Sequence, residues 1–72
     1  MTIEDDLKFI VETYGMPLWA THYGMVDDNF EFIFKVGDNY FYEYFENFEY
    51  GIRCVGDTEG VIEIPEEFKN DY

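Results

Sequence analysis

The apolar positions follow two different periods along the chain, and the first period is that of a helix. Between Thr2 and Tyr14 the apolar residues recur at the spacing of a single helix face: Ile3, Leu7, Ile10, Val11 and Tyr14. Thr2 can cap the first turn, with Asp5 three residues later. Gly15 and then Pro17 provide an end. The pattern therefore predicts an amphipathic helix over about residues 2–14.

The second period is two, which is typical of strands. Phe30, Phe32, Phe34 and Val36 alternate with other residues, so one face of a strand would be aromatic. Turn-forming residues at 26–29, 37–39 and 56–60 separate this run from its neighbours, and the Gly37-Asp38-Asn39 run predicts a three-residue hairpin loop. The segments 18–25, 49–55 and 61–64 are strand-like in composition and complete the predicted sheet.

Residues 40–50 fit two different elements. As a strand, Tyr40, Tyr42 and Tyr44 share one face; as a helix, an aromatic stripe would run from Phe41 to Phe48. We prefer the strand, because aromatic residues favour strands over helices and a hairpin signal precedes them. The expected fold is α+β, with the N-terminal helix packed on a four- to five-stranded antiparallel β-meander over about residues 18–64. An acidic tail, residues 65–72, follows.

The charge of the chain narrows its set of partners. Seventy-two residues allow one domain, and the 22% of aromatic residues indicates a folded core rather than disorder. Seventeen acidic against four basic residues give a net charge of −13. This charge disfavours direct binding to nucleic acid or to anionic membranes and favours a basic protein partner. An acidic surface also keeps an aromatic-rich protein soluble, so both explanations stay open from composition alone.

Residues for catalysis, metal binding or cofactor binding are scarce. The chain has no serine, one histidine (His22) and one cysteine (Cys54), which we expect to be a small core residue. Asp27 to Glu31 partly matches a calcium loop but lacks its glycine and its final glutamate, where Asp38 stands, so at most a weak divalent-cation site remains open. We predict a protein that is not an enzyme and needs no metal or cofactor. The absence of a signal sequence favours the cytoplasm.

Acids and rings alternate most densely between Asp27 and Tyr50. Side chains two apart on a strand are about 6.6 Å from each other, so carboxylates on strands and turns can approximate an array of phosphates. We expect the phenylalanines to be buried, and the acids and some tyrosines to face a partner. The predicted partner-binding residues are Asp27, Asp28, Glu31, Asp38, Tyr42, Glu43, Glu46 and Glu49.

In size, acidity and acid–aromatic interleaving, residues 27–50 resemble small phage-encoded DNA-mimic inhibitors of the anti-CRISPR and anti-restriction type. The resemblance implies a stoichiometric inhibitor, a monomer or homodimer, that occupies a basic nucleic-acid-binding groove in the host cytoplasm. The alternative is an immunity or antitoxin-like protein that neutralises one basic toxin or nuclease through shape as well as charge.

Overall fold

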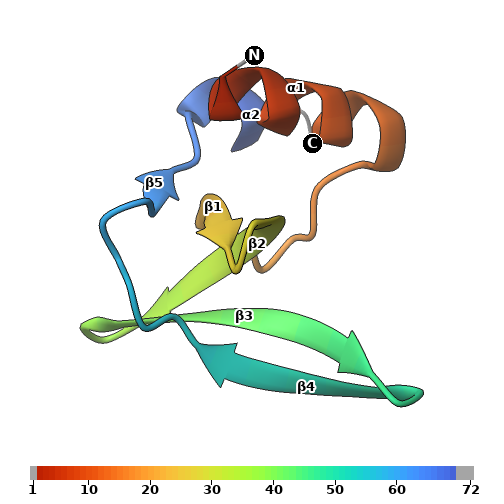
Figure 1. The fold of residues 1–72 in the computed structure, drawn as a ribbon. Coiled ribbons are helices and arrows are strands. Elements are labelled where there is room, and N and C mark those ends of the chain that lie inside the picture. The colour runs from red at the N-terminus through yellow and green to blue at the C-terminus, as the bar shows by residue number, and fades with distance from the viewer. Residues whose placement is uncertain (1, 70–72) are drawn as a thin grey trace.

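A computed structural model describes residues 2–69 of the chain and has the predicted α+β arrangement (Figure 1). The elements in order are α1 (Ile3–Tyr14), β1 (His22–Val26), β2 (Asn29–Val36), β3 (Asn39–Glu46), β4 (Glu49–Cys54), β5 (Ile62–Glu63) and α2 (Glu66–Lys69). The strands pair antiparallel in the order β4-β3-β2-β1-β5. The helices lie on one side of the molecule, and the β3–β4 hairpin lies at the far end from them (Figure 1).

The first helix begins and ends where its sequence predicts. The Thr2 hydroxyl accepts a hydrogen bond from the Asp5 N–H at 3.3 Å, and the Asp5 carboxylate accepts one from the Thr2 N–H at 3.3 Å. This capping box satisfies two backbone donors at the N-terminus. Gly15, at φ 86°, ends the helix. The buried face of the helix is one turn shorter than its apolar stripe, because Tyr14, the last residue of the stripe, is exposed.

Three tight turns connect β1 to β4. Asp27-Asp28 and Asn47-Phe48 form two of them, and all four residues have positive φ. The third turn is Gly37-Asp38, so the predicted three-residue loop is wrong: Asn39 already pairs with Val36 and begins β3. The strand interpretation of residues 40–50 is confirmed, with the turn at 47–48 dividing them between β3 and β4.

The last strand departs from the simple meander. β1 to β4 follow one another across the sheet, but β5 returns to the opposite edge and pairs with β1. Its connection from β4, residues 55–61, crosses a sheet face, where Val55 and Val61 pack with Ile33. At Gly24 the crossing is so close that an added Cβ would lie 2.7 Å from the carbonyl oxygen of Gly60.

The sheet therefore has a core on each face. Leu7, Ala20, Tyr23 and Ile64 form the core under α1. Ile33, Tyr42 and Val55 form the other, with Tyr40 and Tyr44 packed against it. The expectation that some tyrosines face outward holds for Tyr50, which is exposed, but not for Tyr42, because the 55–61 connection covers its face of β3. Cys54, expected in a core, is exposed for the same reason: it alternates to the uncovered face.

Candidate protein-binding surface

The sheet opens between β2 and β3. These two strands pair only over Ile33–Val36 with Asn39–Tyr42, whereas the β3–β4 pairing continues to Glu46 and Glu49. Residues 43–52 consequently form a two-stranded ribbon, the β3–β4 ribbon, that diverges from β2 (Figure 1). The ribbon and the first half of β2 are the two walls of an open hollow.

This hollow brings together four of the predicted partner-binding residues. Its lining comes from β1, β2 and their turn on one wall and from β3 and β4 on the other: Val26, Asp27, Asn29, Glu31, Tyr42, Tyr44, Phe45, Glu46 and Arg53. Partial burial raises the pKa of Glu31. Arg53 donates a hydrogen bond to Glu46 at 2.9 Å, and its guanidinium carbon lies 4.0 Å from the centroid of the Tyr44 ring. Arg53 thus offsets only part of the negative charge here.

The remaining predicted residues are divided over the sheet. Asp28 lies beside Asp27 in the β1–β2 turn, and Glu49 lies opposite Glu46 beside the β3–β4 turn. Because alternate hairpin turns of an antiparallel sheet lie at the same end, these four carboxylates share one end, which we call the acidic end. The other two acids do not belong to it: Asp38 occupies the turn at the opposite end of the sheet, and Glu43 points from the other face of β3.

Tyr42 requires a correction. It is 7% exposed and belongs to the core beneath the 55–61 connection, so its ring cannot be presented to a partner. Exposure was expected because the chain has more rings than one small core can hide, and only the covering connection determines which face of β3 is buried.

The structure also exposes an apolar surface on the ribbon, which includes Phe45 and Phe48, two phenylalanines that we expected to be buried. Phe45, Phe48, Tyr50 and Ile52 are 58%, 94%, 74% and 64% exposed. Phe45 and Tyr50 pair across the strands, with ring centroids 4.7 Å apart. Among the described residues, neither core includes any of these four side chains. We call them the apolar ribbon surface.

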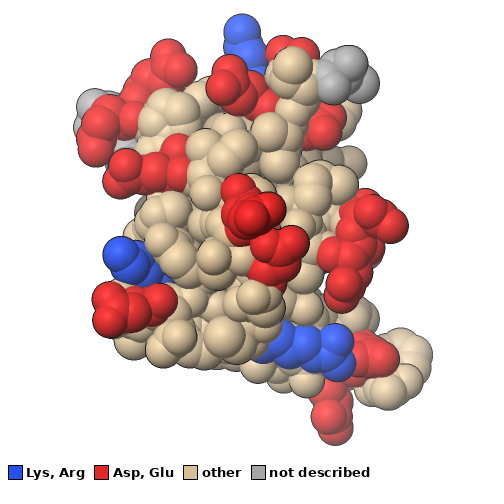
Figure 2. Space-filling model, turned by 60° about the vertical axis from the view of Figure 1, so that its left-hand side comes forward, with Lys and Arg blue, Asp and Glu red and all other residues tan. Residues whose placement is uncertain are grey.

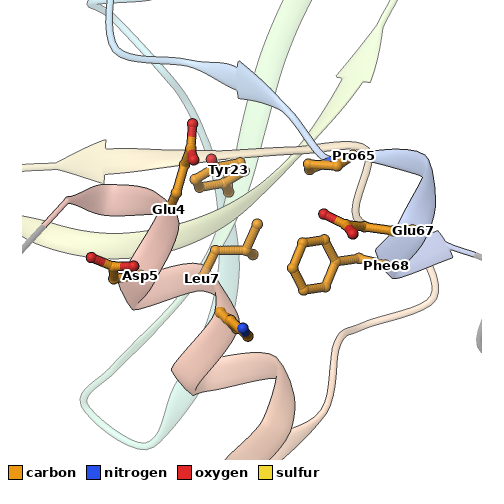
Figure 3. Close-up of a pocket in the computed structure, with 8 residues that line it drawn as sticks. Glu4, Asp5, Leu7, Tyr23, Pro65, Glu67 and Phe68 are labelled. Carbon is orange, nitrogen blue, oxygen red and sulfur yellow. The ribbon is translucent and has the colours of Figure 1, made fainter.

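A small cavity of about 150 Å³ lies between α1 and α2 (Figure 3). The side chains of Leu7, Tyr23 and Phe68 supply its apolar part, and Glu4 and Glu67 are among its acids (Figure 3). Burial raises the pKa of Tyr23, and the negative charge of Glu4 adds to this shift. The lining contains no histidine, cysteine, serine or threonine, so it offers no nucleophile paired with a base.

The lone histidine has a structural role outside this cavity. One ring nitrogen of His22 lies 2.8 Å from the Thr21 hydroxyl, and its ring meets Tyr40 edge-on with centroids 5.1 Å apart. Within residues 2–69, no group of three or more His, Cys, Asp or Glu side chains is arranged to hold a metal ion. The features with an evident binding potential are therefore the acidic end and the apolar ribbon surface.

The chain matches no protein-family model, no curated protein and no solved structure. Within the described range, neither helix combines the length and the apolar character needed to cross a bilayer.

Proposed function

We propose that this chain is a non-catalytic acidic inhibitor that occupies a basic nucleic-acid-binding groove of another protein, as a DNA mimic. The observation that carries the proposal is the uncompensated charge of the surface. Four basic residues cannot neutralise seventeen acids, and red carboxylates are spread over the face shown in Figure 2 with few blue side chains between them. Such a surface attracts a basic groove and repels nucleic acid itself.

The acidic end is the part of this surface best placed for the contact. Asp27, Asp28, Glu46 and Glu49 are all exposed, and they lie on or beside two turns that project from the same end of the sheet. Exposed carboxylates on turns can approach a groove without rearrangement of the strands. The inhibitor would act in the cytoplasm of the cell that contains its target.

A second candidate function is supported by a different feature. The apolar ribbon surface suits a contact defined by shape, as expected of an immunity or antitoxin-like protein that neutralises one basic toxin or nuclease. The two functions differ in the proteins that the chain would bind and in the surface that it would occupy. A DNA mimic would compete with DNA on its target, whereas a toxin inhibitor would bind one cognate protein even at a surface that does not hold DNA.

Displacement of a fluorescent DNA duplex from purified CRISPR effectors and restriction enzymes tests the first function. The chain should displace the duplex from at least one of them, and its affinity should fall steeply as salt is raised. The informative variant combines Asp27→Asn, Asp28→Asn and Glu49→Gln, because asparagine tolerates the positive φ of the turn. It should weaken inhibition by about tenfold or more, since each close charge pair contributes to a desolvated contact.

The matched control combines Glu12→Gln, Glu63→Gln and Glu67→Gln, which removes the same charge from exposed positions in α1, β5 and α2. An equal loss in both variants would show that net charge alone acts and would remove the acidic end from the proposal. Failure to displace DNA from any enzyme in the panel would reject the DNA-mimic function.

A further inference from the structure

Phe48 occupies a backbone position that suits glycine. It lies at the tip of the β3–β4 ribbon with φ 66°, beside Asn47 at φ 53°. The other residues with positive φ in the hairpin turns are Asp27, Asp28 and Gly37, which are types that tolerate this conformation. Phe48 is the bulky exception, and at 94% exposure its ring gains almost no burial in return. A strained and solvated ring at a turn tip points to a role in contact with another molecule.

The ring adjoins the rest of the apolar ribbon surface. Phe45 and Tyr50 form a ring pair next to the turn, and Ile52 follows one cross-strand position further along the same face. Each of these side chains is more than half exposed. Clustered exposed rings are typical of the centre of protein–protein interfaces. Because residues 43–46 and 49–52 pair only with each other, the ribbon can enter a pocket while the rest of the sheet stays intact.

The charges beside the surface indicate what covers it. Glu43 lies on the same face, directly across the strands from Ile52, and it is exposed. A second copy on this face would bring like carboxylates into an apolar interface and join two molecules that each carry −13. A protein with lysine or arginine around an apolar pocket would instead pair with Glu43 and with Glu49 beside the tip.

We propose that the β3–β4 ribbon is the recognition element, and that Phe48 with the Phe45–Tyr50 pair inserts into an apolar pocket with a basic rim on the partner protein. The basic character of that partner rests on the proposed function. In this arrangement the acidic end directs the encounter, and the buried rings hold the complex once the ribbon is seated.

Two peptides of equal positive charge serve as probes of this chemistry. One is composed of arginine only, and the other is an amphipathic helix with arginine on one face and leucine on the other. Titrations followed by calorimetry and by amide NMR should show that the amphipathic peptide binds about tenfold or more tightly, with shifts concentrated in residues 45–52. Its advantage should persist in high salt, because apolar contacts are not screened.

The variant Phe48→Gly separates recognition from folding, because glycine suits the turn. It should reduce the affinity of the amphipathic peptide to that of the arginine peptide and leave the latter unchanged. The matched control is Phe9→Ala, which removes a ring that is 62% exposed on α1 and should change neither affinity.

Equal binding of the two peptides, or retained preference in Phe48→Gly, would overturn the inference. So would concentration-dependent dimerisation in sedimentation that Phe48→Gly abolishes, because the covering partner would then be a second copy. The DNA-displacement panel reports on the proposed function separately. If the chain displaces DNA but binds the two peptides equally, the DNA-mimic function is supported and the role of the ribbon in recognition is rejected. If it prefers the amphipathic peptide but displaces no DNA, the role of the ribbon is supported, with a basic partner that does not hold DNA.

Discussion

Replacing Phe48 by glycine is expected to stabilise this protein although it deletes a phenyl ring. A left-handed conformation costs an L-residue about 1–2 kcal/mol, and glycine adopts it without that cost. Glycine loses more backbone entropy on folding, which offsets about 0.5–1 kcal/mol. The ring is 94% exposed, so its removal forfeits almost no apolar burial. The central values of these two ranges leave an increase in the free energy of unfolding of about 0.5–1 kcal/mol.

Urea unfolding followed by Trp19 fluorescence measures this change, because Trp19 packs edge-on against Phe34 with ring centroids 5.5 Å apart. For a domain of this size the melting temperature should rise by about 2–8 °C. Phe48→Ala is the control: it removes the ring but keeps a side chain at φ 66°, so the free energy of unfolding should change by less than about 0.5 kcal/mol. A glycine variant less stable than both other proteins would refute the reasoning, since it would mean that the ring stabilises the fold.

Three further substitutions test the core beneath the 55–61 connection and the hollow. Gly24→Ala should lower the free energy of unfolding by about 1–3 kcal/mol in urea titrations, because its Cβ would lie 2.7 Å from the backbone oxygen of Gly60. Unchanged stability would show that the 55–61 connection can move away from the added Cβ without cost. Ile33→Ala, at a fully buried position, should cost about 2–5 kcal/mol and leave much of the protein unfolded by circular dichroism, whereas Val36→Ala at an exposed position should not. Because burial raises the pKa of Glu31 above its ordinary 4.5, wild-type stability should fall as pH rises through that pKa. Glu31→Gln should therefore be the more stable protein at pH 7 and lose its advantage in acid; the opposite order would contradict the partial burial of this carboxylate.

Local features of this chain follow directly from its sequence. The helix from Ile3 to Tyr14 begins at a threonine whose cap involves Asp5 and ends at Gly15, so each signal lies within a few residues of the helix end that it sets. The hairpin at Gly37-Asp38 is similarly local, and only its length was mistaken. An antiparallel sheet with one covering helix follows from these elements, since the helix has a single apolar stripe to bury.

The candidate site could be predicted only in part. The acids at Asp27, Asp28, Glu46 and Glu49 meet at one end because hairpin connectivity places alternate turns together; the turn at 27–28 was predicted from the sequence, but the turn at 47–48 was not. The divergence of β2 from β3 could not be predicted from the sequence. It depends on where pairing stops, at Ile33 and Tyr42, and no turn or breaker residue marks that point within either strand.

By itself, the sequence determined the helix, the strand-forming segments and the large negative charge, because each depends on composition or on residues close together in the chain. The tertiary structure alone decided which face of β3 is buried. Rings occupy both faces, so their hydrophobicity does not distinguish Tyr42 from Phe45. The distinction comes from the return of residues 55–61 to place β5 beside β1, which buries Tyr42 and leaves Phe45 exposed. A contact between segments so far apart in the chain has no local signature in either of them.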